Sequence, residues 1–106
     1  MSKTNASPIY GLVVEEEIHL TLVELCQACH ASAEHVTSWV FEGVLEPLGK
    51  TPEEWRFTGQ SLRRARLAVW LASDLDINPP GIAMAVDLLE KITALRARLQ
   101  RISKTE

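Results

Sequence analysis

Apolar residues begin to recur at helical spacing near residue 20. Thr21 and Glu24 have the spacing of a capping box, which predicts that a helix begins there. One face of this helix carries Leu22, Leu25, Cys26 and Cys29. Ser32 opens a second short helix that ends before Gly43. Its apolar face carries Val36, Trp39 and Val40. Two short helices separated by a tight turn predict a helix-turn-helix.

The next segment combines a turn with alternating apolar flanks. Residues 44–47 and 55–57 lie on either side of a turn region at 49–52, a pattern typical of a two-stranded wing. Thr58 or Ser61 then caps a third helix that runs to about Leu75, and its helical apolar spacing predicts a position deep in the core. The apolar positions are Leu62, Ala65, Val69 and Ala72, widened by Leu67, Trp70 and Leu71.

The sequence Asn78-Pro79-Pro80-Gly81 breaks this helix, and a proline in the first turn starts a fourth one. The fourth helix has the most regular pattern in the chain, with apolar residues spaced three and four apart as in a coiled-coil seam. The predicted dimerisation seam is Ala85, Leu88, Ile92, Leu95, Leu99 and Ile102. A second stripe exists only in the first half, which is therefore expected to dock on the domain. That stripe is Ile82, Val86 and Leu89.

These elements predict a mainly α fold, in which a winged helix-turn-helix with a small β wing is followed by a long C-terminal dimerisation helix. A flexible N-terminus is expected at residues 1–8, the helix-turn-helix domain at 9–77 and the long helix at 78–106. Within that domain, residues 9–17 contain a short β-prone piece that ends in three glutamates.

Composition and charge narrow the function classes. The 106 residues are 46% hydrophobic and 24% charged, which is typical of one globular domain. No apolar run is long enough to span a bilayer and the N-terminus has no apolar signal region, so a cytoplasmic location is expected. The net charge of −3 is divided unevenly, with nine acids and two bases in residues 1–55 but nine bases and five acids in residues 56–106. The two halves therefore present opposite fields to partners.

Cys26-Gln27-Ala28-Cys29-His30 has the spacing that attaches a c-type haem. The absence of an export signal and the position of both cysteines on an apolar helix face favour simple packing, because free cysteine behaves as a small hydrophobic residue. A zinc site built from the two cysteines and His19 or His30 is the other alternative, although no second pair follows at finger spacing. We expect no cofactor and no metal.

Catalytic motifs give little support for an enzyme, since the chain has no glycine-rich phosphate loop, nucleophile elbow or HExxH sequence. A winged helix-turn-helix suggests DNA binding, in which the second helix enters the major groove. Residues 33–42 contain Glu34 and Glu42 but no lysine or arginine, so that helix would repel phosphates. Arg63, Arg64 and Arg66 could contact a DNA backbone or could neutralise acids within the protein.

An acidic surface is better suited to a basic protein partner. Phe41 is predicted on the outward side of the second helix, where it could anchor a contact or could instead pack under the wing. The candidate partner-binding residues of this half are Glu34, Phe41, Glu42, Glu46, Glu53 and Glu54. A second acidic cluster brackets the break before the long helix and contains Asp74, Asp76, Asp87 and Glu90.

Several strings in the chain resemble a known family. Residues 20–26 (LTLVELC), 32–34 (SAE) and 43–47 (GVLEP) resemble the MerR-type helix-turn-helix. Residues 55–58, the pair Leu75-Asp76, the string PGIAMA at 80–85 and the heptad helix extend this resemblance to CbpM, the chaperone modulatory protein family. It covers roughly residues 18–102, and residues 77–79 lengthen the segment before Pro80 relative to the family pattern.

The resemblance implies a MerR-like fold that has left DNA binding. Family members bind the J-domain of the DnaJ-like co-chaperone CbpA, and they block both its stimulation of the Hsp70 partner DnaK and its association with DNA. J-domains are basic along their second helix, which agrees with the acidic face predicted from this sequence. The expected function is therefore a non-enzymatic J-domain inhibitor or adaptor that forms a homodimer, and the alternative is a small MerR-like DNA-binding regulator.

Overall fold

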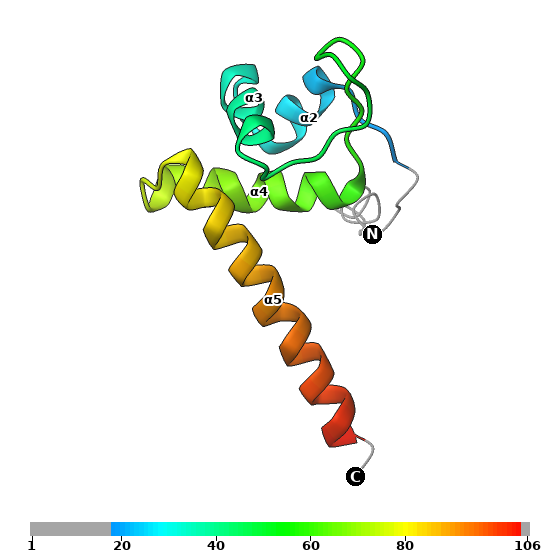
Figure 1. The fold of residues 1–106 in the computed structure, drawn as a ribbon, viewed down its shortest axis with the longest axis vertical. Helices are drawn as coiled ribbons and strands as arrows, with labels where there is room; N and C mark the ends of the chain where they lie inside the picture. The colour runs from blue at the N-terminus through cyan, green and yellow to red at the C-terminus, as the bar shows by residue number, and fades with distance from the viewer. Residues whose placement is uncertain (1–17, 105–106) are drawn as a thin grey trace, which may run out of the picture.

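A computed structural model describes residues 18–104 of the chain. Within this range four helices follow one another: α2 (Leu22–Cys29), α3 (Ala33–Phe41), α4 (Gly59–Asp74) and α5 (Pro79–Lys104). The short pair α2 and α3 packs above α4, and α5 turns back from the end of α4 and then leaves the domain (Figure 1). The predicted flexible terminus at 1–8 and the β-prone piece at 9–17 lie outside the described residues.

The helix-turn-helix begins and ends where the sequence predicts. Thr21 accepts a hydrogen bond from the Glu24 amide, and the Glu24 carboxylate accepts one from the Thr21 amide at 2.9 Å, which completes the capping box. The Ser32 hydroxyl caps α3 by accepting a hydrogen bond from the His35 amide at 3.1 Å. After α3, Gly43 adopts a φ of 84°, a left-handed conformation that costs glycine little. A Cβ there would touch nothing within 4 Å, so backbone conformation is the reason for glycine at this position.

The wing contains less β structure than the sequence predicts. In residues 18–104 it consists of two isolated antiparallel bridges, Leu20 with Phe57 and Leu48 with Arg56, and no continuous strand forms. The loop between Leu48 and Arg56 turns at Gly49, whose φ is 102°. A Cβ on this residue would lie 2.5 Å from the Glu54 carbonyl oxygen, so only glycine fits. The residues between Leu48 and Arg56 bond among themselves: the Glu54 amide donates to the Thr51 carbonyl at 2.8 Å and the Trp55 amide to the Pro52 carbonyl at 3.3 Å, so these amides do not extend the ladder.

The core lies between the helix-turn-helix, the wing and α4. Trp39, Phe57, Leu25, Leu45 and Leu62 are its largest fully buried side chains. The buried face of α4 differs from the predicted one. It is formed by Ser61, Leu62, Ala65, Ala68 and Leu71, whereas Val69 and Ala72 are half-buried and Trp70 is exposed.

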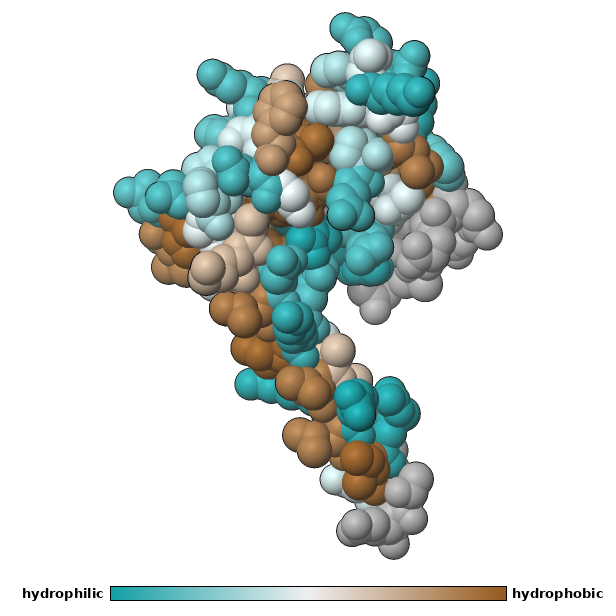
Figure 2. Space-filling view, in the orientation of Figure 1, coloured by the Kyte–Doolittle hydropathy of each residue, from teal (hydrophilic) through white to brown (hydrophobic). Residues whose placement is uncertain are grey.

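The long helix α5 starts at Pro79, as the proline pattern predicts. The Asn78 side chain accepts a hydrogen bond from the Gly81 amide at 2.8 Å and so caps the helix. Ile82 and Val86 are buried against the domain, whereas every residue from Glu90 to Ser103 is exposed. Figure 2 shows the apolar side chains following one edge of this projecting helix.

Candidate docking surfaces

The exposed face of α3 is acidic and carries one large apolar side chain. Phe41 is 79% exposed, so it lies outward and does not pack under the wing. Glu34 is exposed in the first turn of α3, and Glu42 is exposed at the C-terminal cap of the same helix. Neither α2 nor α3 contains a lysine or an arginine. The helix that would enter a DNA groove therefore presents carboxylates and an aromatic ring, as the sequence predicts.

The other three candidate acids of this half occupy different positions. Glu46 is exposed at the rim of a polar pocket that lies between the segment after α3 and the start of α4. Glu54 is used within the wing, where its carboxylate accepts a hydrogen bond from the Lys50 amide at 3.3 Å. Glu53 lines a shallow pocket on the α2 side of the wing, next to the exposed Val23. We use the name α3 face for Glu34, Phe41 and Glu42 together with Glu46, which is exposed four residues after the α3 cap.

The second predicted cluster is divided in the structure. Asp74 and Asp76 are exposed at the turn between α4 and α5. Asp87 and Glu90 instead meet Arg64, which precedes Asp74 on α4 by ten residues, or about 15 Å of helix. Asp87 and Glu90 therefore do not form one patch with the turn residues.

Arg64 is the centre of the polar contacts between α5 and the rest of the domain. Its side chain is only 14% exposed. Its Nε atom donates to the Val44 carbonyl oxygen at 2.5 Å, its Nη2 atom to the Asp87 carboxylate at 3.0 Å, and its Nη1 atom to the Glu90 carboxylate. We call this group the Arg64 joint. Of the three arginines on this helix, Arg64 is therefore paired with acids of the protein, and these acids belong to α5 and not to the acidic half at residues 1–55.

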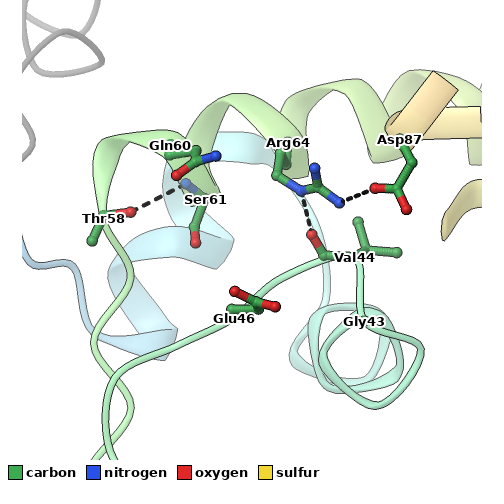
Figure 3. A pocket seen from close by; sticks show the side chains of 8 residues that line it. All are labelled: Gly43, Val44, Glu46, Thr58, Gln60, Ser61, Arg64 and Asp87. Carbon is green, nitrogen blue, oxygen red and sulfur yellow. Dashed lines mark hydrogen bonds and ion pairs between the residues drawn. The ribbon is translucent and has the colours of Figure 1, made fainter. Parts of the chain in front are cut away.

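A cavity of about 250 Å³ lies beside the Arg64 joint (Figure 3). Its lining is mostly polar and includes Glu46, Thr58, Gln60 and Ser61. In Figure 3 the guanidinium group of Arg64 lies between the Val44 carbonyl and the Asp87 carboxylate at one side of this space. Each of the three nitrogens of Arg64 already donates one hydrogen bond, and two carboxylates face its charge, so this side chain is engaged within the protein.

Cys26 and Cys29 are packing residues of α2. Cys29 belongs to the buried core and Cys26 is partly buried against it. Burial raises the pKa of both thiols, and for Cys29 the neighbouring Cys26 raises it further. Among residues 18–104 no three His, Cys, Asp or Glu side chains are grouped as a metal site would require. The geometry thus favours helix packing over the zinc alternative.

The predicted dimerisation seam forms a continuous apolar stripe on α5. Leu88, Ile92, Leu95, Leu99 and Ile102 are between 43% and 63% exposed, and Ala85 is half-buried. Three further large apolar side chains are exposed outside this seam, namely Trp70, Leu75 and Met84. The apolar pattern of the third helix predicts Trp70 in its widened core stripe, whereas the tertiary packing leaves Trp70 47% exposed. No helix in the described part of the chain is both long and apolar enough to cross a membrane.

Comparison with known proteins fits this architecture. The family model of MerR HTH family regulatory proteins matches residues 20–104. The chaperone modulatory protein CbpM of Coxiella burnetii (strain Dugway 5J108-111) is 40% identical over 98 residues, which cover 92% of each chain. The chain belongs to the CbpM family. The CbpM proteins of Pseudomonas putida (strain W619) and Pseudomonas entomophila (strain L48) are each 38% identical over 80 residues, which cover 76% of this chain and 79% of theirs. These relatives are named as modulators and the matching family as regulatory.

Proposed function

We propose that this chain is a non-enzymatic modulator that binds the J-domain of a DnaJ-like co-chaperone of the CbpA type. In this proposal it blocks the stimulation of Hsp70 by that co-chaperone, together with the association of the co-chaperone with DNA. Two lines of support converge. The relatives that cover most of the chain are named chaperone modulatory proteins, and the family resemblance implies a partner with a basic helix.

The α3 face carries this proposal, because its chemistry complements such a helix. Its three carboxylates are solvent-exposed, and neither of the two helices of the motif offers an opposing base. Exposed charges of this kind act mainly on encounter rate and partner choice. Phe41 supplies the apolar area that charges alone do not provide, since hot spots of interfaces are typically large side chains that become fully covered.

The alternative is a small MerR-like DNA-binding regulator, and the same surface opposes it. A recognition helix gains affinity by replacing the counterions of phosphates with lysine and arginine side chains. The α3 helix has none and would bring Glu34 towards the phosphates. We expect weak duplex binding, and a sequence-specific gel shift at physiological salt would favour the alternative.

The proposal includes a homodimer formed through α5. Fully burying a leucine or isoleucine side chain contributes about 1.5–3 kcal/mol, so covering the exposed half of five of them yields about 4–8 kcal/mol per protomer. Because both protomers contribute, the total is about 8–16 kcal/mol against an association cost of about 4–15 kcal/mol. Residues 67–90 contain four acids and no base, while 91–104 contain five bases and no acid. This distribution favours pairing in opposite directions, because parallel pairing would align the basic halves.

The experiment that tests docking compares two matched neutralisations by calorimetric titration with a purified J-domain. Glu34→Gln/Glu42→Gln removes two charges from the α3 face, and Asp74→Asn/Asp76→Asn removes two from the α4–α5 turn. Asparagine is chosen at position 76 because Asp76 has a φ of 55°, which asparagine tolerates. The proposal predicts weaker and less salt-dependent binding for the first variant only. If the second variant alone loses affinity, the docking surface is the turn.

A further inference from the structure

Few apolar side chains hold α5 to the domain. Among the residues of α5 whose burial is described, Ile82 and Val86 are the only fully buried ones and lie one turn apart, with Ala83 and Ala85 partly buried beside them. Beyond them the packing between α4 and α5 opens into a groove of about 360 Å³ that is lined by Leu67, Leu89, Thr93 and Ala94, among others. The side chains from Glu90 to Ser103 are all exposed. Apolar packing therefore ends before the helix leaves the domain.

The Arg64 joint lies where this packing ends. Arg64 contacts Asp87, which directly follows the buried Val86, and Glu90, about one turn beyond Val86, and it also donates to the Val44 carbonyl of the segment that follows α3. A nearly buried guanidinium group that donates to each of three acceptors has little freedom to move. From this geometry we infer that Arg64 is a positioning residue: it fixes the angle at which α5 leaves the helix-turn-helix domain.

The contact between Arg64 and Glu90 limits how far the free end of α5 can move. Two contacts at residues 82 and 86 are about 6 Å apart along the helix, whereas contacts at residues 82 and 90 are about 12 Å apart. If the helix pivots at residue 82 and shifts sideways by about 1 Å at residue 86, residue 102 is displaced by about 5 Å. The same shift at residue 90 displaces residue 102 by about 2.5 Å. The Arg64 joint thus halves the displacement of the predicted dimerisation seam relative to the α3 face. In a dimer formed through α5 the joint would also fix the separation of the two docking surfaces, a consequence that rests on the proposed function.

Arg64→Met is the variant that isolates this role. The substitution removes the cation from beside Asp87 and Glu90, whose side chains are already 63% and 42% exposed and stay solvated. The Val44 carbonyl loses its donor, but the adjoining polar cavity of about 250 Å³ has room for a replacement water. Arg66→Met is the matched control, because Arg66 is exposed on the same helix. Asp87→Ala/Glu90→Ala is a second variant that opens the joint from the α5 side.

The test is the distance distribution between spin labels on genetically encoded residues at positions 34 and 100, with the labelled chain diluted in unlabelled chain. Both positions are exposed. We expect one narrow distribution for the natural sequence and for Arg66→Met, and at least a twofold broader one for Arg64→Met and for Asp87→Ala/Glu90→Ala. An unchanged width in both joint variants would overturn the inference, even with a lower melting temperature. If Arg64→Met does not fold, the double alanine variant decides. No partner is present, so the outcome does not depend on J-domain binding.

Discussion

Replacing Phe41 by alanine should weaken partner binding while leaving the free protein almost as stable as before. The ring is 79% exposed, so about one fifth of it is covered in the isolated chain. Fully burying a phenylalanine side chain contributes about 1.5–3 kcal/mol, and the covered fifth therefore contributes only about 0.3–0.6 kcal/mol to folding. A change of this size lies close to the error of a denaturation experiment.

A partner that covers the remaining four fifths of the ring would gain about 1.2–2.4 kcal/mol from it. Since about 1.4 kcal/mol corresponds to a tenfold change, Phe41→Ala should raise the dissociation constant for the J-domain about 7- to 50-fold. Single charge removals on the α3 face should each cost only about 0.2–1 kcal/mol, because exposed ion pairs are weak. Phe41 should therefore matter more than any one glutamate.

The assay is titration calorimetry for binding beside urea denaturation for stability, with Val23→Ala as the matched control. Val23 is also an exposed apolar residue, at 64%, but it lies near Glu53 on the α2 side of the wing. The reasoning predicts a large binding loss for Phe41→Ala and a small one for Val23→Ala. A larger loss for Val23→Ala would refute it and would move the docking centre to the wing.

Four further outcomes follow from the fold. Leu95→Asp should convert the homodimer to a chain of 11.8 kDa in light scattering at micromolar concentration, and an 11.8 kDa mass for the natural sequence would contradict the dimer. Thr21→Ala removes one half of the capping box and should lower the free energy of unfolding by about 1 kcal/mol, measured by thermal denaturation. Replacing Cys26 and Cys29 together by alanine should cost stability but not J-domain affinity. Because burial raises the pKa of both thiols above their ordinary value of 9.0, their alkylation should be slow at pH 8 and its rate should still be rising with pH at 9.0. Fast alkylation of the folded protein at pH 8 would contradict this assignment.

Local signals made much of the fold predictable from the sequence. The capping box at Thr21, the serine cap at Ser32 and the proline start of α5 each depend on residues a few positions apart, and each is confirmed. The wing was harder to predict, because alternation shows that a segment can pair but not how many bridges the connecting loop allows. The helical pattern of α4 likewise gave the element but misplaced Trp70, since packing partners decide which side of a wide stripe is covered.

The candidate site was predictable in composition and less so in arrangement. The acidic, base-free character of α3 and the outward side of Phe41 follow from the sequence alone, and the packed structure was needed to show that the ring does not pack under the wing. Charge runs gave no sign that Asp87 and Glu90 belong to Arg64 and not to the turn at Asp74. That pairing joins residues 23 and 26 positions apart in the chain. Only the tertiary fold brings them together.

The central claim is that the α3 face inhibits a J-domain, and an ATPase titration tests it most directly. Purified chain is added to Hsp70 that is stimulated by its J-domain co-chaperone, beside the triple reversal Glu34→Lys/Glu42→Lys/Glu46→Lys, whose dimer is first verified by light scattering. We expect the natural sequence to abolish stimulation with saturation near one protomer per J-domain, and the triple reversal to leave stimulation intact. Persistent stimulation at a large excess of the natural sequence, or equal inhibition by the triple reversal, would contradict the account.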